Sequence, residues 1–326
     1  MTISSATRFT LTDTPLSHRQ SAVHNTPEKS PMASTIKSWI EAMRLRTLPV
    51  SIAGVLVGTG CAGAIDGFSP LPALVCLVFA VLAQIASNFA NEYFDFRNGL
   101  DRKGREGFRR GVTEGDISPL AMKRATYLTL LLACAVGLSL IFYGGWWLIV
   151  AGILIALFAL AYSAGPYPLS HHGLGDIAVI IFFGIVPVTL TAYVQTASFA
   201  ALPYSLPLSI ATGILAALVL VVNNYRDCDD DRLVGKRTSV VILGRKFMSR
   251  AYLSGAFIAL TIAALTLIFT GHYIAAFPII IFYNLYFLLW KQLTTLSGKS
   301  LNPLLGKTAM LLLAFAAYIS ITLFLH

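Results

Sequence analysis

The sequence predicts an all-α polytopic membrane protein with nine transmembrane helices, a cytoplasmic N-terminus and a C-terminus outside. Three observations lead to this fold class. Hydrophobic residues make up 56% of the chain and charged residues 12%, about half the charged share of a soluble domain. Apolar runs close to the ~20 residues that a bilayer core requires recur along the chain. When these runs are taken as spans, the basic residues all fall on one side of the membrane.

Nine apolar runs follow one another along the chain. We place them at residues 48–65, 71–94, 127–143, 147–162, 175–195, 206–224, 252–270, 273–290 and 309–325. Gly144-Gly145-Trp146 joins the third run to the fourth, and Gly271-His272 joins the seventh to the eighth. Connections this short predict helical hairpins. The sequence lacks the short alternating segments that are typical of a membrane β-barrel.

Orientation follows from the 24 lysines and arginines, because basic residues accumulate in cytoplasmic connections. They lie before the first run and between runs two and three, six and seven, and eight and nine. A cytoplasmic N-terminus therefore places all of them inside, and nine spans put the C-terminus outside. The net charge of +9 reflects this topology, so no nucleic-acid partner is needed to explain it. We expect an integral protein of the bacterial cytoplasmic (inner) membrane.

Residues 1–33 differ in character from the rest of the chain. They are polar, rich in Ser and Thr, and lack the apolar segment of a secretory signal. We expect a disordered tail, or an upstream extension with Met32 as the working start; an organelle transit peptide is an alternative. The membrane domain is then expected over residues 34–326. It would begin with a short helix along the inner membrane surface, with an apolar face made by Ile36, Trp39, Ile40 and Met43.

The end of the second run carries a polar stripe on an otherwise apolar helix. At 100° per residue, an arc of about 60° contains Gln84, Asn88, Asn91 and Asp95. Asn98-Gly99 predicts the end of this helix. Asp101 is then expected to return from the following loop to the same place.

A second group of acids ends the sixth run. Asn223 and Asn224 precede Asp227, and Asp231 follows four residues later on the same helix face. Both polar groups end helices that run from the outside to the inside. We therefore expect them to face the same inner mouth, with basic residues directly behind each of them.

Carboxylates at this density repel one another and are costly to remove from water, so cations must compensate them. The nearby basic residues supply part of the positive charge. A hard divalent cation would supply the rest, and Mg²⁺ suits carboxylate, amide and phosphate oxygens. Two acidic groups, Mg²⁺ and a basic rim together predict a site for a diphosphate.

Two other interpretations of these acids stay open. Asp and Asn near helix ends are often caps or solvated loop residues. A transporter with an acidic cation path is the second interpretation. Transporter sites usually lie near the bilayer midplane, whereas the middles of these runs carry no charge.

From about Glu41 to the last run, the sequence resembles the UbiA-type intramembrane prenyltransferases. Asn91-x3-Asp95 with Asp101, and Asp227-x3-Asp231, stand at the positions of that family's two Asp-rich motifs. The resemblance implies nine transmembrane helices around a central cavity, with both motifs at its cytoplasmic mouth. It also implies Mg²⁺-dependent transfer of a polyprenyl group from its diphosphate to an aromatic acceptor.

The first motif departs from the usual family spacing, because Asp101 follows Asp95 by six residues instead of four. In this spacing the sequence resembles the branch of the family that prenylates 1,4-dihydroxy-2-naphthoate in menaquinone synthesis. Glu92 is a further difference, because many members have Asp at that position. Three further stretches resemble that branch, namely Arg105–Gly111 with Met122–Ala125, Tyr162–Leu169 with Gly173–Asp176, and Asn223–Thr238. The branch implies attack at the carbon that bears the carboxylate, loss of CO₂, and no covalent enzyme nucleophile.

The resemblance also implies roles for individual residues. Catalysis is expected to depend on Asp95, Asp101, Asp227 and Asp231. The metal ligands are expected to be the same four aspartates and Asn91. Substrate binding is expected at Asn88 and at four basic residues that would neutralise the departing diphosphate, namely Arg46, Arg105, Arg110 and Lys236.

Some alternatives remain within and outside this enzyme class. Another aromatic acceptor, such as 4-hydroxybenzoate or homogentisate, would require the same motifs. A non-catalytic transporter or quinone-binding membrane protein is the alternative outside the class. His171-His172 is interpreted as a polar loop more readily than as a substrate contact, and Asp176 as a helix cap.

Overall fold

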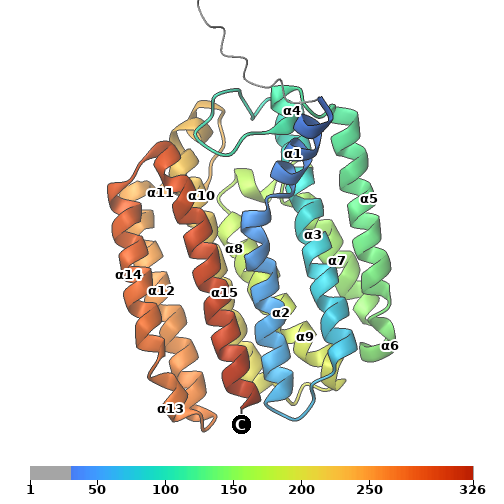
Figure 1. The fold of residues 1–326 in the computed structure, drawn as a ribbon, viewed down its shortest axis with the longest axis vertical. Helices are drawn as coiled ribbons and strands as arrows, with labels where there is room; N and C mark the ends of the chain where they lie inside the picture. Colours follow the sequence, from blue (N-terminus) through green and yellow to red (C-terminus); the bar gives the residue numbers. More distant parts are fainter. Residues whose placement is uncertain (1–30, 326) are drawn as a thin grey trace, which may run out of the picture.

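The computed structural model describes residues 31–325, with side chains from Ile36 onward, and its regular elements in this range are all helical (Figure 1). The tail expected over residues 1–33 lies outside the described residues except for 31–33, where the first helix begins. The all-α fold class is thus confirmed for residues 31–325.

The long helices carry most of the chain. They are α2 (Leu48–Gly63), α3 (Pro70–Arg97), α5 (Pro119–Leu138), α7 (Leu148–Ala161), α9 (Val186–Thr196), α10 (Leu202–Leu233), α12 (Arg245–Phe269), α14 (Ile279–Thr295) and α15 (Asn302–Phe324). Shorter pieces connect or extend them. They are α1 (Pro31–Met43), η1 (Leu45–Thr47), α4 (Gly111–Glu114), α6 (Ile141–Gly144), η2 (Leu169–His171), α8 (Gly175–Val179), the π-helical turn η3 (Ile180–Ile185), α11 (Ser239–Leu243), α13 (Tyr273–Ala276) and η4 (Gly298–Leu301).

Each of the nine predicted apolar runs is helical. Within the described residues, eight helical segments are long and apolar enough to cross a membrane, judged by length and composition. The fourth predicted run forms α7, whose 14 residues fall short of the ~20 that a bilayer core requires. The topology of nine crossings, with its orientation, therefore stays a prediction.

Helix α10 forms the centre of the bundle, since more of its surface is buried than that of any other spanning segment described. It packs closely against η3, where a Cβ on Gly213 would lie 2.5 Å from the carbonyl oxygen of Ile180. Helices α2 and α15 lie side by side in Figure 1, and a Cβ on Gly60 would meet Ser320 Cα at 2.6 Å. Small residues thus let the backbones approach closely at both contacts.

The two helices that carry the acidic groups are longer than a membrane core. Helix α10 has 32 residues and α3 has 28, which correspond to about 48 and 42 Å, against the ~30 Å hydrocarbon thickness. Their last turns therefore extend beyond the apolar layer. The predicted stop of α3 is confirmed: Gly99 has a φ of 69°, and Leu100 N–H donates to the Asp95 carbonyl.

The short N-terminal helix α1 lies across the end of the bundle beside α4 (Figure 1). Its predicted apolar face is divided. Trp39 and Met43 pack into a small core around Phe89, whereas Ile36 and Ile40 remain 57% and 46% exposed. Only half of the expected apolar face is thus available to a membrane surface.

The close approach of α10 to η3 yields a prediction on stability. Gly213→Ala would insert a methyl group against the Ile180 carbonyl, and we expect it to destabilise the fold by about 1–3 kcal/mol. A Cβ on Gly306, in α15, meets no atom within 4 Å, so Gly306→Ala should leave stability unchanged or raise it slightly. Thermal unfolding in detergent micelles measures both; equal melting temperatures would contradict the packing argument.

Candidate functional site

The ends of α3 and α10 meet at a polar cavity of about 600 Å³. The turn between α1 and α2 and the loop before α4 form two further parts of its wall, and Lys236 closes it from beyond α10. The cavity lies at the end of the bundle that carries α1 and α4, opposite the end of α15 (Figure 1). The ends of the two helices therefore meet at one mouth, where Asp227 and Asp231 line the cavity, whereas Asp95 and Asp101 contact bases of its wall without lining it.

Asp95 is fully buried and lies behind the cavity wall, where it contacts bases that line the cavity. Lys236 Nζ donates to its Oδ2 at 2.7 Å, and His171 Nε2 lies 3.1 Å from its Oδ1. Arg110 Nη2 approaches the same carboxylate to 3.8 Å. Burial alone would lower the pKa of Lys236, but the facing Asp95 and Asp231 raise it above its ordinary value. Lys236 thus stays charged and compensates the buried acid.

Arg105 joins the two acidic groups across the mouth. Its guanidinium donates to Asp101 from the first group and, at 2.9 Å, to Asp227 Oδ2 from the second. Arg226 also binds both oxygens of Asp227, at 2.7 and 2.8 Å. Asp231 lines the same cavity and, among the described residues, forms no ion pair within 4.0 Å. The acids are therefore held mainly by arginine and lysine.

The predicted polar stripe of α3 faces the turn between α1 and α2. Asn91 Oδ1 accepts from Arg44 at 2.6 Å and from Arg110 at 2.9 Å. Asn88 Nδ2 donates to the Met43 carbonyl at 2.9 Å, and Gln84 lies one turn earlier. Arg44 holds this position with a φ of 52°, a strained conformation for a residue other than glycine. The stripe thus fixes the chain where it enters α2.

Three of the four predicted basic residues face the carboxylates, namely Arg105, Arg110 and Lys236. Arg46 lines the cavity but lies apart, with its guanidinium 4.9 Å from the ring centre of Phe108. Sequence reasoning did not single out Arg44 or Arg226. The only available signal for Arg226 was its place next to Asp227.

Two smaller expectations can also be compared with the structure. The interpretation of His171 as a plain polar loop residue misses its contact with Asp95. Asp176 is not the cap of its helix, because Leu174 holds the N-cap position and Asp176 lies inside the first turn.

Glu92 accepts from the backbone N–H of Val112 at 3.0 Å and so anchors the start of α4.

The donor set fits Mg²⁺ in one particular way. Among the described residues, no three His, Cys, Asp or Glu side chains come close enough to hold a metal by themselves. Mg²⁺ is usually bound by one or two carboxylates together with substrate phosphates, and seldom by an all-protein cage. Asp101 Oδ2 is buried without a hydrogen-bond partner. Burial raises the pKa of Asp101, although Arg105 opposes this effect. The site therefore fits a cation that arrives with an anionic ligand.

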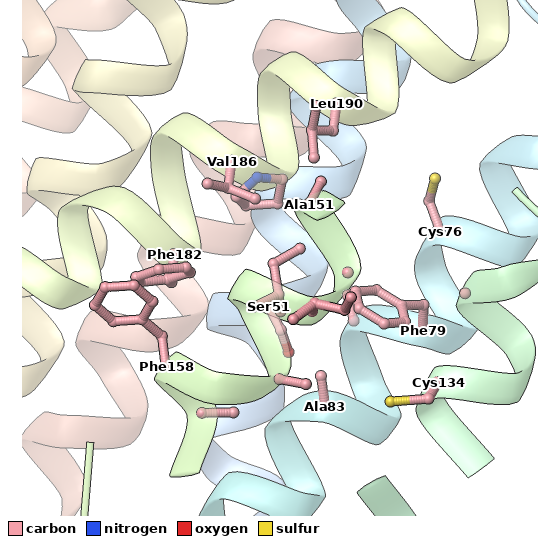
Figure 2. Close-up of a pocket in the computed structure, with 18 of the residues that line it drawn as sticks. Ser51, Cys76, Phe79, Ala83, Cys134, Ala151, Phe158, Phe182, Val186 and Leu190 are labelled. Atoms are coloured by element: carbon pink, nitrogen blue, oxygen red, sulfur yellow. The ribbon is translucent and has the colours of Figure 1, made fainter. Parts of the chain in front are cut away.

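A second, apolar cavity of about 410 Å³ lies next to the polar one. Five residues line both cavities, namely Gln84, Ser87, Tyr162, Val179 and Phe183. Figure 2 shows the apolar cavity, with Phe158 and Phe182 together on one side and Phe79 on the other. The charged cavity and the apolar cavity are thus adjacent and share part of their walls.

Comparisons with known proteins agree with this geometry. Residues 51–305 match the profile of the UbiA prenyltransferase family. The chain is 40% identical over 220 residues to 1,4-dihydroxy-2-naphthoate octaprenyltransferase of Escherichia coli (strain K12), covering 65% of this chain and 70% of that relative. It is 36% identical over 231 residues to the Haemophilus influenzae protein of the same name, with coverages of 67% and 72%.

A solved structure is similar in fold. It is a UbiA homolog from Archaeoglobus fulgidus bound to GPP and Mg²⁺, with a TM-score of 0.67 at 14% identity. The alignment covers 89% of this chain and all of that one. At this identity the likeness concerns the fold alone.

The balance of buried charge yields a second prediction. Lys236→Met should destabilise the protein by about 3 kcal/mol, because it leaves the buried Asp95 carboxylate with weaker partners. Arg102→Met removes an ion pair with Asp230 in which the arginine is 47% exposed, so its effect should stay below about 1 kcal/mol. Denaturant unfolding of both variants provides the measurement. A Lys236→Met protein as stable as Arg102→Met would show that Asp95 does not depend on Lys236.

Proposed function

The chain belongs to the UbiA prenyltransferase family, and on that premise we propose that it prenylates 1,4-dihydroxy-2-naphthoate in menaquinone biosynthesis. A polyprenyl diphosphate would be the donor, and CO₂ and diphosphate would be released. One observation carries the proposal. A charged cavity between two acidic helix ends adjoins an apolar cavity and shares five wall residues with it, which suits a donor with a diphosphate head and a hydrocarbon tail.

The choice of acceptor is supported by the relatives. The Escherichia coli and Haemophilus influenzae proteins are both named for 1,4-dihydroxy-2-naphthoate and an octaprenyl group. The six-residue spacing from Asp95 to Asp101 agrees with this branch. We assign the acceptor on these grounds, and leave the length of the prenyl chain open.

The diphosphate would lie between the two acidic groups. Asn91, Asp95, Asp101, Asp227 and Asp231 supply oxygen ligands for Mg²⁺, the cation in the structure of the Archaeoglobus fulgidus homolog. Bound Mg²⁺ would offset the negative charge of the diphosphate as it leaves. Arg105, Arg110 and Lys236 surround the same space and are placed to bind the phosphate oxygens.

The reaction breaks the allylic C–O bond and forms a bond from the prenyl C1 to the acceptor carbon that bears the carboxylate. The electron pair of the C–O bond leaves with the diphosphate. The electron pair of the lost carboxylate returns to the ring as CO₂ departs, which restores the aromatic quinol. The allylic cation that develops must be kept from water. Tyr162 and Phe183, which line both cavities, stand where the charged space ends.

The apolar cavity is suited to the isoprenoid tail. Its walls come from α2, α3, α5, α7 and α9. Helix α7 has only 14 residues, and several of its side chains, such as Ile153 and Leu157, are more than half exposed. The tail would thus run beside α7 toward the lipid, while the seam between α2 and α15 is closed by small residues in contact.

We further propose that the polar mouth faces the cytoplasm of a bacterial inner membrane. All basic residues fall on one side under nine crossings, and the mouth is at the end that carries α1 and α4. This placement gives a water-soluble acceptor direct access to the site. Labelled prenyl diphosphate, Mg²⁺ and each of three acceptors (1,4-dihydroxy-2-naphthoate, 4-hydroxybenzoate, homogentisate), incubated with membranes, would separate the alternatives.

Loss of either central carboxylate should abolish activity. We expect Asp95→Ala and Asp227→Ala each to remove Mg²⁺-dependent prenyl transfer without preventing membrane insertion, because each acid binds the cation–diphosphate unit. Transfer of label from prenyl diphosphate is the measurement, and EDTA should abolish it in the wild type. Near-normal turnover by both variants would contradict the proposed mechanism.

Filling the apolar cavity should shorten the accepted donor. Gly152 of α7 lines this cavity, and a Cβ there meets no atom within 4 Å, so Gly152→Phe should occupy space meant for the tail. We expect turnover of octaprenyl diphosphate to fall roughly tenfold or more, since a methylene in an apolar pocket is worth about 1–3 kcal/mol. Geranyl diphosphate should be little affected.

The matched control is Gly306→Phe, because Gly306 also has open space but lines neither cavity. It should treat both donors like the wild type. An equal loss with short and long donors in Gly152→Phe would place the tail elsewhere.

A further inference from the structure

The C-terminal part of the chain carries positive charge that few acids compensate. Residues 232–326 contain nine lysines and arginines and no aspartate or glutamate. Two of these bases pair with acids that lie earlier in the chain. Lys246, Arg250 and Lys291 form no ion pair within 4.0 Å with any residue of the described part of the chain. Within residues 31–325 their charge is thus uncompensated.

These three bases lie on two neighbouring antiparallel helices, α12 and α14 (Figure 1). Tyr283 of α14 fixes their register. Its ring centre lies 4.9 Å from that of Phe257, and its hydroxyl lies 2.7 Å from that of Thr261. Arg250 precedes these two residues by two to three turns of α12, and Lys291 follows Tyr283 by about two turns of α14. Arg250 and Lys291 therefore stand at the same level on the two helices.

The two bases of α12 lie on the side that faces α14. At 100° per residue, Lys246 and Arg250 each fall within about 20° of Phe257, which contacts α14. On the other helix, Lys291 Nζ lies 4.8 Å from the ring centre of Phe287. All three bases are exposed. We call this outer contact line the α12–α14 seam; three bases from two helices mark its end beside α11.

The bases stand at the level expected for lipid head groups. Helix α12 has 25 residues, or about 37 Å, against the ~30 Å hydrocarbon thickness. Its first two turns, which carry Lys246 and Arg250, therefore reach beyond the hydrocarbon layer. Further along the two helices, Phe257, Ile258 and Phe287 are exposed. The surface thus combines positive charge with an apolar strip that continues into the membrane.

An anionic lipid matches this surface better than a soluble anion does. The three bases line neither cavity, so water and salt would screen their attraction for a small anion. A lipid is already held beside the apolar strip by its acyl chains, and bases at the membrane surface then add to its binding. A zwitterionic lipid brings its own ammonium group, which cancels that gain. Charge complementarity therefore selects a lipid with a net negative head group.

We propose that the α11 end of the α12–α14 seam binds an anionic phospholipid. Arg250 and Lys291 hold its phosphate from the two helices, and Lys246 adds a third positive charge. The acyl chains lie along Phe257 and Phe287. The lipid bridges both helices of this hairpin, of which α12 packs against the central helix α10. The site is separate from both cavities and does not depend on the proposed donor or acceptor.

Native mass spectrometry of the purified full-length protein tests the proposal, with dioleoylphosphatidylglycerol and dioleoylphosphatidylcholine as probes. The wild type should bind phosphatidylglycerol roughly tenfold or more tightly than phosphatidylcholine. The double variant Arg250→Gln with Lys291→Gln should bind phosphatidylglycerol roughly 25-fold more weakly, since each base at the membrane surface is worth about fivefold. Its affinity for phosphatidylcholine should not change. Inorganic phosphate should compete poorly, because it lacks acyl chains.

The matched control is Lys123→Gln with Arg124→Gln. It removes the same charge from exposed positions near the start of α5, at the same end of the bundle, but from one helix only (Figure 1). This variant should bind both lipids like the wild type. Arg250→Lys keeps the charge and should retain the preference for phosphatidylglycerol. All variants should melt at the wild-type temperature in phosphatidylcholine, because the replaced side chains are exposed.

Three outcomes would overturn the proposal. Equal affinity of the wild type for the two lipids would remove the selection by charge. An equal loss in both double variants would mean that the net charge of the surface attracts phosphatidylglycerol without a site at the seam. An unchanged affinity after replacement of Arg250 and Lys291 would place the lipid elsewhere. None of these measurements uses prenyl transfer, so a failure of the proposed function would be recognised separately.

Discussion

The structure depends on the neutralisation of buried carboxylates at the ends of two long helices. Asp95 and Asp227 are almost wholly removed from solvent, and an unpaired buried charge is among the most destabilising features a fold can contain. Arg105 binds Asp227 of α10 and Asp101 of the loop after α3, and Lys236 binds Asp95 of α3. The loops that carry these bases therefore fold against the helix ends and form part of the cavity wall.

In this mouth most of the buried carboxylates are paired with bases before any ligand arrives. An anion that brings its own divalent cation can exchange one set of ion pairs for another, because the cation takes the carboxylates while the bases take the phosphates. This exchange explains why carboxylates and bases alternate around the cavity and why no ready-made group of three acids occurs in residues 31–325. A protein that held its metal permanently would be expected to group its acids instead.

Helix length decides where the chemistry can take place. Because α3 and α10 exceed the membrane core, their last turns carry charge without exposing it to lipid. The apolar cavity starts where the polar stripe of α3 ends, near Gln84 and Ser87. Charged and apolar side chains therefore line separate, adjacent spaces in the bundle.

The sequence by itself determined the helical membrane fold, the two acidic groups and their meeting at one end. Hydropathy and helical periodicity are local properties, and for that reason the stripe on α3 and the stop at Asn98-Gly99 were predictable. The division of the apolar face of α1 was not, because it depends on what packs against Trp39. The ion pairs were not predictable either: Lys236 and Asp95 are 141 residues apart, and Arg105 and Asp227 are 122 apart. Only the packing of α3 against its neighbours decides which base reaches which acid, and the tertiary structure leaves Arg46 without an acid partner among residues 31–325.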